Sequence, residues 1–349
     1  MKDSQSLPKK PKKFIRKTVK PVVSSKTETL PIVPQSLEIK AAFFSNLKKS
    51  LLLLLIPISL FVIFLILTLI NNYYLGKIVE EQPKAFPADI KINPYPFIQE
   101  APLLSITAKS AIILDTDSQV VVFSKNPSLP LSMASTTKIM TALTALDFFQ
   151  NNSILTVKSF GVEGTGLGFI PGQQFYFEDL LYAMLLPSAN DAAQAVADNY
   201  PGGASVFVTK MNEKAAGFHL STMHFVDPTG LEDTGDYTTV ADLARLASIA
   251  IQNKEFADVV GTKQKIITTV NKLNQFNLNN LNKLLGIDGV TGIKTGTTEG
   301  AGEVLVTSVV NKGHTFIIVV MNSTDRFTDT EVLINFINQK VQFISPTHF

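Results

Sequence analysis

The sequence has no cysteine in 349 residues and only four histidines, and just 17% of its residues are charged. The absence of cysteine excludes a thiol nucleophile, a thiolate metal site and any disulfide framework. The histidines are scattered, at positions 219, 224, 314 and 348, which argues against a histidine-rich metal site. With 45% hydrophobic residues the chain is too apolar for a disordered protein, and its length supports at least one large core.

The formal net charge of +2 averages two unlike parts of the chain. Residues 1–50 hold 12 lysines and arginines against 3 acidic residues, whereas residues 51–349 hold 19 basic and 26 acidic residues. A basic tail is one mark of a nucleic-acid-binding protein, but this tail has few aromatic residues between its lysines. Because an apolar segment follows the tail directly, we predict no nucleic acid partner.

A run of twenty residues without charge, Leu51–Ile70, follows the basic tail. As a helix rising about 1.5 Å per residue, it would span the roughly 30 Å core of a bilayer, so we predict a transmembrane anchor. A buried core helix and a cleaved signal peptide are the alternatives, but fifty residues precede the segment and no A-x-A-like cleavage site follows it. Lys48 and Lys49 favour a cytoplasmic N-terminus, with everything after Ile70 outside the cell membrane.

Two further parts follow the apolar segment. Residues 71–104 contain several prolines and no regular period, which predicts an extended tether; an ordered arm packed on the following domain is the alternative. Residues 105–345 have the composition of one globular domain without internal repeats. We expect no second anchor after this domain, so the N-terminal helix is predicted to attach the protein to the membrane.

The globular domain begins and ends with strand-like segments. Ser110–Asp115 and Gln119–Ser124 are β-branched runs separated by a short turn, and Gly302–Val310 and His314–Met321 form a second such pair. Helices are expected at Met133–Phe149, Phe177–Leu186, Asp191–Asn199 and Thr328–Phe343. This order predicts an α+β fold in which both ends of the domain contribute to one antiparallel sheet.

The first candidate for chemistry is Ser135, which is followed three residues later by Lys138 near the start of a predicted helix. Three residues are close to one helical turn, so the two side chains share a face. A serine hydroxyl needs a base to act as a nucleophile, and a buried lysine with a lowered pKa is such a base. The free N–H groups at a helix N-terminus suit a developing oxyanion. The spacing alone is common by chance, and a solvated helix start is the alternative.

Two further motifs place polar groups beside apolar segments. Ser188 and Asn190 lie at the break between two apolar helices, where they either cap the second helix or serve a site beside Ser135. The run Lys294–Thr297 ends a β-like stretch; there Gly296 would let a ligand backbone approach closely, and the lysine supplies positive charge. An ordinary strand edge is the alternative for this run.

The order S-x-x-K, S-x-N and K-T-G along one chain resembles the penicillin-recognising serine enzymes. The stretches AKSAIILD, MASTTKIMTALTAL, DLLYAMLLPSANDAA, HFVDPTGL and GVTGIKTGTTEGAGEVLV are similar to the low-molecular-mass D-alanyl-D-alanine carboxypeptidases among the penicillin-binding proteins. The resemblance covers about residues 105–345. It implies a β-lactamase/transpeptidase-like fold, with an antiparallel sheet flanked by helices and a helical subdomain. It also implies a serine carboxypeptidase that shortens peptidoglycan stem pentapeptides and binds β-lactam antibiotics covalently.

The resemblance carries catalytic roles to matching positions. Ser135 would attack the carbonyl between the two D-alanines, and Lys138 would accept its proton. Ser188 would pass a proton toward the leaving amine, assisted by Lys294. Water would then hydrolyse the acyl-enzyme and D-alanine would be lost. The resemblance implies no metal and no organic cofactor.

Substrate contacts are implied in the same way. Asn190 would hold the substrate's peptide amide, and the backbone N–H groups of Ser135 and Thr297 would form the oxyanion hole. Thr295 and Arg326 would receive the terminal carboxylate, for which a guanidinium group is well shaped. For Arg326 a surface ion pair is the alternative.

Other activities share parts of this pattern. A D,D-endopeptidase that cleaves peptide crosslinks uses the same catalytic set. A class A β-lactamase needs a glutamate between S-x-N and K-T-G, and none of Glu213, Glu232 or Glu255 is followed by asparagine four residues later. A wall-binding or sensor module that never turns over is a minor alternative, because the nucleophile and both lysines are present.

Two stretches receive no catalytic role. Asp227 stands where the family more usually has asparagine, and we expect it to be a structural turn position. Residues 161–169 are rich in glycine, but they neither follow a convincing strand nor open a helix with Lys-Ser/Thr. A phosphate-binding loop is therefore not predicted there.

Overall fold

The computed structural model describes residues 53, 55–75, 94–98 and 103–344, and the chain divides into two units at residue 90. In the first unit, Leu55–Leu75 is a helix long and apolar enough to cross a membrane. The helix extends five residues beyond Ile70, because those residues contain no helix breaker, and the predicted anchor at Leu51–Ile70 stays a prediction. The basic tail, residues 1–50, lies outside the described residues.

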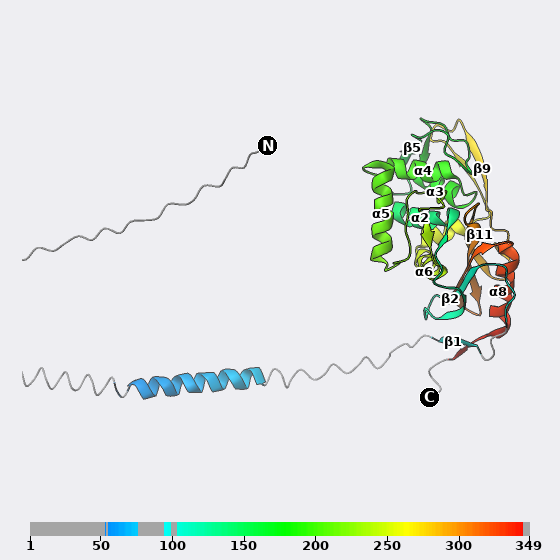
Figure 1. Cartoon of the computed structure of the whole chain (residues 1–349). Helices are drawn as coiled ribbons and strands as arrows, with labels where there is room; N and C mark the ends of the chain where they lie inside the picture. Colours follow the sequence, from blue (N-terminus) through cyan, green and yellow to red (C-terminus); the bar gives the residue numbers. More distant parts are fainter. Residues whose placement is uncertain (1–52, 54, 76–93, 99–102, 345–349) are drawn as a thin grey trace, which may run out of the picture. The chain divides into compact units, whose positions relative to one another are not determined.

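The second unit contains a five-stranded antiparallel sheet, in the order β10-β11-β12-β2-β3. Figure 1 labels its strands β2 and β11. The strands are β2 (Ser110–Asp115), β3 (Val121–Lys125), β10 (Val290–Thr298), β11 (Gly302–Asn311) and β12 (His314–Ser323). In the central pairing, Ile318 of β12 lies opposite Ile113 of β2. The two ends of the domain therefore share one sheet, which confirms the predicted α+β fold.

Both faces of this sheet are buried. Ile113 and Ile318 belong to a cluster with Leu333 of α8 (Arg326–Lys340), whereas Ile112 belongs to the larger cluster on the other face. Successive side chains of a strand point to opposite faces, which is why neighbouring residues of β2 enter different clusters. Helix α8 packs on β11 and β12, and α6 (Val240–Ala250) packs on β12 and β2.

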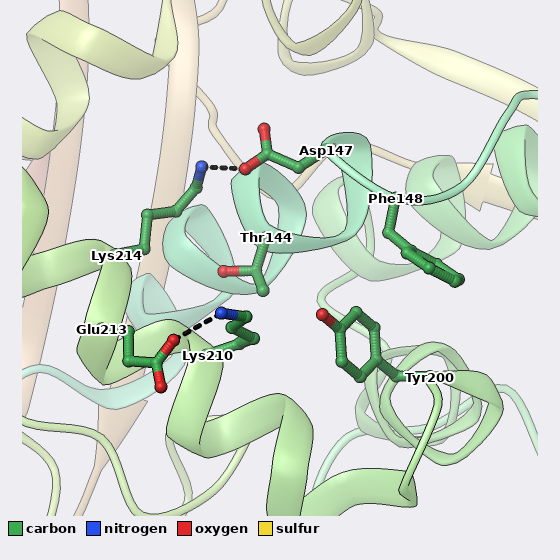
Figure 2. Close-up of a pocket in the computed structure, with 7 residues that line it drawn as sticks. All are labelled: Thr144, Asp147, Phe148, Tyr200, Lys210, Glu213 and Lys214. Atoms are coloured by element: carbon green, nitrogen blue, oxygen red, sulfur yellow. Dashed lines mark hydrogen bonds and ion pairs between the residues drawn. The ribbon is translucent and has the colours of Figure 1, made fainter.

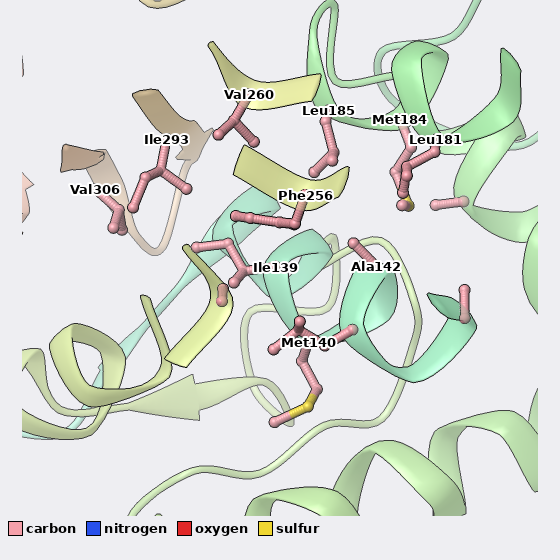
Figure 3. Close-up of a cluster of buried hydrophobic side chains, with 14 of the residues drawn as sticks. Ile139, Met140, Ala142, Leu181, Met184, Leu185, Phe256, Val260, Ile293 and Val306 are labelled. Carbon is pink, nitrogen blue, oxygen red and sulfur yellow. The ribbon is translucent and has the colours of Figure 1, made fainter. Parts of the chain in front are cut away.

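A group of helices adds a helical region to the sheet. These elements are η1 (Ala134–Thr137), α2 (Lys138–Leu146), α3 (Phe177–Leu185), α4 (Asn190–Asn199), α5 (Gly203–Gly217) and α7 (Lys254–Val260). Figure 3 shows Ile139 of α2, Leu185 of α3 and Phe256 of α7 in one buried cluster with Ile293 of β10. Helix α2 is thus fixed both to the other helices and to the edge strand of the sheet.

The single helix expected at Met133–Phe149 is wrong at both ends. It begins as the tight 3₁₀ turn η1, and α2 ends at Leu146. At the start of the helix the reason lies at Ala134, whose φ of 47° is in the left-handed region that L-residues adopt rarely. Gly230 and Gly296, which are distant in sequence, lie against Ala134, so no local pattern signals this bend.

The end of the domain also differs from expectation. The helix predicted over Thr328–Phe343 stops at Lys340, and Val341–Ile344 forms strand β13. β13 pairs antiparallel with β1 (Tyr95–Ile98), which lies inside the stretch expected to be a tether. For this part of residues 71–104 the structure has the ordered arm, while residues 76–93 and 99–102 lie outside the described residues.

Short strand pairs complete the fold. They are β4 (Leu131–Ser132) with β7 (Tyr237–Thr238), β5 (Ile154–Thr156) with β6 (Gln174–Tyr176), and β8 (Gln264–Thr268) with β9 (Gln275–Asn279). The β4–β7 pair connects the chain just before η1 to the segment just before α6. It therefore helps to fix the position of η1, which contains Ser135 and is called the serine turn below.

Replacing Ile318 by alanine tests the central packing. Ile318 is fully buried between β2 and β11, so we expect the free energy of unfolding to fall by about 2–5 kcal/mol. Ile266→Ala is the control, because Ile266 is 58% exposed. Denaturant unfolding of the two variants measures both changes, and equal losses would contradict this packing.

Candidate active site

The predicted nucleophile and base lie one turn apart. Ser135 is partly exposed in η1, and Lys138 is fully buried as the first residue of α2. The Nζ atom of Lys138 lies 2.9 Å from the Oγ atom of Ser135. The two side chains are therefore close enough for direct proton transfer.

Two carbonyl groups orient the amine of Lys138. Its Nζ donates to Oδ1 of Asn190 and to the backbone oxygen of Thr229, each at 2.7 Å. Both partners are acceptors only, so they hold two N–H groups of the amine. When Lys138 is neutral, its lone pair is left to face the hydroxyl of Ser135.

Burial also adjusts the charge of Lys138. It lowers the pKa of this lysine to about 7, and nearby carboxyl groups oppose the effect in part when they are ionised: Asp227 first, then Asp236 and Asp191. A buried ammonium loses the hydration that stabilises it in water, which is why the neutral form gains. At neutral pH a large fraction of Lys138 is therefore a free amine that can accept a proton.

The S-x-N motif reaches the same lysine from α4. Asn190 is the first residue of that helix and is 97% buried, with its side-chain oxygen on Lys138. Ser188 has a φ of 67°, a left-handed conformation that costs an L-residue roughly 1–2 kcal/mol and is common at functional sites. The contact of Asn190 with a substrate amide stays a prediction, whereas its contact with Lys138 was not foreseen.

The glycine-rich stretch, residues 161–169, lies against this motif. Asn190 donates from its backbone N to the Thr165 oxygen and from Nδ2 to the Glu163 oxygen, both at 2.7 Å. A Cβ on Gly164 would lie 2.6 Å from Nδ2 of Asn190, and its φ is 78°. Only glycine fits there, so this stretch holds the site together although sequence reasoning gave it no role. Its glycines were the available signal.

Strand β10 brings the K-T-G motif to the serine turn. A Cβ on Gly296 would lie 3.0 Å from Cβ of Ala134 and 3.1 Å from the backbone N of Ser135. The missing side chain therefore lets the strand lie directly against the backbone of the nucleophile. Thr295 and Thr297 lie on the same face of the strand because they are two residues apart, with Thr295 buried and Thr297 exposed at its end.

Positive charge gathers next to this strand. Lys294 is 99% buried and donates from Nζ to the Thr295 oxygen at 2.9 Å. Its pKa is lowered well below the usual range, first by burial and then by the positive charges of Lys138 and Arg326. Such a cluster favours binding of an anion, which would relieve the repulsion among the three groups.

Arg326 completes the cluster from the start of α8. Its Nη1 donates to the Gly296 oxygen at 2.7 Å and to Oγ1 of Thr297, and its backbone N donates to Oε2 of Glu303. Its Nε is buried without a hydrogen-bond partner. The structure thus joins Arg326 to the K-T-G strand, and an unpartnered guanidinium donor suits a carboxylate.

The glutamates considered for a β-lactamase lie elsewhere. Glu213 pairs with Lys210, and Glu232 accepts from the backbone and hydroxyl of Thr234. Within the part of the chain that the structure describes, neither these two nor Glu255 has a hydrogen bond or ion pair with Ser135 or Lys138. The arrangement therefore lacks the glutamate contact that a class A β-lactamase requires.

A separate hollow of about 360 Å³ has no residue of the predicted site in its lining (Figure 2). It is lined by Thr144, Asp147, Phe148, Tyr200, Lys210, Glu213 and Lys214. Its charged groups form two ion pairs, Lys210 with Glu213 and Lys214 with Asp147. Because Lys210 and Glu213 pair with each other, as do Lys214 and Asp147, the charged groups of the hollow are occupied, and its lining includes neither Ser135 nor Lys138.

Comparisons with known proteins agree with this geometry. Residues 96–325 match the peptidase S11 family, described as D-alanyl-D-alanine carboxypeptidase. The chain is 30% identical over 225 residues to D-alanyl-D-alanine carboxypeptidase DacF of Bacillus subtilis, which covers 62% of this chain and 58% of that protein. It is 29% identical over 229 residues to the D-alanyl-D-alanine endopeptidase of Pseudomonas aeruginosa, covering 64% and 74%.

A solved structure shares the fold. The Streptomyces K15 DD-transpeptidase superposes with a TM-score of 0.63 at 28% identity, covering 68% of this chain and 98% of that chain. The fold and the serine–lysine site thus define a penicillin-binding class of serine peptidase. Since the family match covers more than half of the chain, the protein belongs to the peptidase S11 family of D-alanyl-D-alanine carboxypeptidases. It spans somewhat more than half the length of DacF.

Replacing Gly296 by alanine tests the contact between β10 and η1. The new Cβ would push on Ser135 and Ala134 at about 3 Å, so we expect acylation of Ser135 by a fluorescent penicillin to slow by about tenfold or more. Gly292→Ala is the matched control on the same strand, because its Cβ would meet the side chain of Val260 instead. If both variants react at the same rate, close approach at Gly296 is not required.

Proposed function

We propose that the protein is a membrane-anchored serine carboxypeptidase that removes the terminal D-alanine from peptidoglycan stem pentapeptides. One observation carries the proposal: the buried amine of Lys138 is held by two carbonyl groups and faces the hydroxyl of Ser135 at 2.9 Å. Membership of the peptidase S11 family supports the same activity. The reaction needs no metal and no organic cofactor.

The first half of the reaction forms an acyl-enzyme. Oγ of Ser135 attacks the carbonyl carbon between the two D-alanines while Nζ of Lys138 takes the hydroxyl proton. The backbone N–H groups of Ser135 and Thr297 stabilise the oxyanion, for which the packing of Gly296 against Ser135 provides support. The C–N bond then breaks as Ser188 passes a proton to the leaving amine and recovers one from Lys138, which returns Lys138 to the neutral form; Lys294 lies beside this relay.

The second half of the reaction, deacylation, regenerates the free enzyme. Water attacks the ester carbonyl on Ser135, and Lys138 takes a proton from that water. The C–O bond to Ser135 breaks, and Lys138 returns the proton it took from water to Oγ of the serine. The products are D-alanine and a peptide shorter by one residue.

The basic groups of Lys138, Lys294 and Arg326 explain why the enzyme would act at the C-terminal end of a peptide. The terminal carboxylate of the peptide binds beside Thr295 and Arg326, where Lys294 adds positive charge and Nε of Arg326 has no other partner. A β-lactam carries a carboxylate and an amide bond in a comparable arrangement, so it enters the same site and acylates Ser135. Asn190 is proposed to hold the peptide amide with the hydrogen-bonding capacity left over from Lys138.

Cleavage of peptide crosslinks is the second candidate activity. It is favoured by the relative from Pseudomonas aeruginosa, which is named an endopeptidase. Both reactions use the same nucleophile and base and differ only in the group that leaves. Product analysis therefore distinguishes the two, while labelling alone does not.

The Ser135→Ala variant tests the nucleophile and the substrate together. We expect a fluorescent penicillin to label the wild-type protein covalently and to leave this variant unlabelled, because the attacking oxygen is gone. Mass spectrometry of wild-type reactions should find free D-alanine from a stem pentapeptide. Persistent labelling of the variant would exclude Ser135 as the nucleophile, and release of monomers from a crosslinked dimer alone would favour the endopeptidase.

The apolar helix is proposed to be a single-pass anchor, with residues 1–50 in the cytoplasm and the catalytic domain on the outer side of the cell membrane. The lysines before the helix support this orientation. A reporter that is active only outside the cytoplasm, fused after Phe349, should be active. A cytoplasm-specific reporter that is active at that position would show the opposite orientation.

A further inference from the structure

A carboxylate outside the three motifs shapes the loop that contacts Lys138. Oδ1 of Asp227 accepts from the backbone N of Thr229 at 2.5 Å, from its hydroxyl at 2.6 Å and from the backbone N of Gly230 at 2.8 Å. Oδ2 accepts from the backbone N of Glu232 at 3.1 Å. These bonds close the turn whose Thr229 oxygen accepts from Lys138.

The same turn is packed on η1, the turn that contains the nucleophile. A Cβ on Gly230 would lie 2.0 Å from the oxygen of Ala134 and 2.6 Å from Oγ1 of Thr137, and the φ of Gly230 is 78°. The turn therefore has no room to move toward η1. Its position, and with it the position of the Thr229 carbonyl, depends on the bonds to Asp227.

A second carboxyl group lies next to Asp227. Asp236 is fully buried, and its Oδ1 accepts from the backbone N of Val226 at 2.6 Å. Its Oδ2 accepts from the hydroxyl of Thr137 at 3.5 Å, and its carboxyl group lies close enough to Asp227 for the charge of that residue to act on it. Two neighbouring carboxyl groups favour the state in which one of them keeps a proton, because two negative charges would repel.

The surroundings assign that proton to Asp236. Burial, and then the charge of Asp227, raise the pKa of Asp236 to about 8. Burial alone would raise the pKa of Asp227 too, but the bonds from Thr229, Glu232 and Gly230 lower it on balance. At neutral pH the two groups therefore carry one negative charge, on Asp227.

We propose that Asp227 and Asp236 are a positioning pair for Lys138: sharing one proton, they hold the Thr229 carbonyl on Nζ and keep one negative charge beside the lysine. The inference rests on the proposed function, in which Lys138 is the base. An asparagine at position 227 would supply an acceptor for the turn but no charge. The charge is therefore what the aspartate adds to its role in the turn.

Other charged groups near Lys138 also influence its pKa. Asp191 of α4 adds negative charge, and Lys294 of β10 adds positive charge. A negative charge favours the ammonium form, so Asp227 raises the pKa of Lys138 above the value that burial alone would give. Removing that charge lowers the pKa, and the free amine then persists to lower pH.

The pH dependence of acylation tests the pair. The rate constant for labelling of the full chain by a fluorescent penicillin is measured from pH 5 to 10 for the wild type and for Asp227→Asn. We expect the wild-type rate to rise through about pH 7 as Lys138 loses its proton. In Asp227→Asn this rise should move to lower pH by about one unit, so that the ratio of variant to wild-type rates is about tenfold larger at pH 5.5 than at pH 9.

Two further variants separate charge from structure. Asp236→Asn keeps this position neutral, so its rise should stay at the wild-type pH. Asp147→Asn is the matched control, because it removes a carboxylate that is 67% exposed at the far end of the same helix, α2, and should also leave the rise in place. If Asp227→Asn keeps the wild-type pH for the rise, the pair does not act on Lys138.

Infrared spectroscopy keeps the proposal testable if Asp227→Asn does not fold. The wild type should lose a protonated-carboxyl band between pH 7 and pH 9.5, as the shared proton leaves Asp236, and Asp236→Asn should lack this change. The same loss in both proteins, or none in either, would overturn the shared proton. A wild type that no penicillin labels at any pH would instead refute the proposed function, so the two failures are distinct.

Discussion

The burial of one amine, that of Lys138, is the constraint on which the rest of the site depends. A buried amine must have its N–H groups bonded or lose its charge, and here both occur. Its partners come from the serine turn, from α4 and from the turn at Thr229, which are far apart in sequence. The helices and the sheet must therefore pack correctly before Ser135 has a base. The site is therefore competent for catalysis only when the whole domain is folded.

The sheet supplies the second half of the site in the same way. Because both of its faces are covered, its edge strand β10 is held rigidly, and Gly296 can lie against the backbone of Ser135 without a side chain between them. Helix α8 packs on β11 and β12, on the face of the sheet away from α6. It begins with Arg326, whose guanidinium donates to the Gly296 oxygen of β10. Two lysines and an arginine thus meet beside the nucleophile, where an anionic ligand would stabilise their charged forms.

Much of the fold follows from local patterns. Strand β2 was predicted residue for residue, because a β-branched run between turns is a local signal. The errors have tertiary causes: the turn at Ala134 breaks a helical pattern, and Val341–Ile344 leaves the helix to pair with β1. For the site, the three motifs were found, whereas the glycine-rich stretch at 161–169 was not, because its partner Asn190 is distant in sequence.

The sequence by itself determined the chemistry that is available: a serine, two lysines and an amide in a fixed order, and no thiol. Only the tertiary structure decided how these groups behave. The lowered pKa of Lys138, the carbonyls that orient it and the proton shared by Asp227 and Asp236 all arise from burial and from contacts between distant segments. Desolvation and hydrogen bonding depend on neighbours in space, so the sequence specifies which residues are present but not their protonation or orientation.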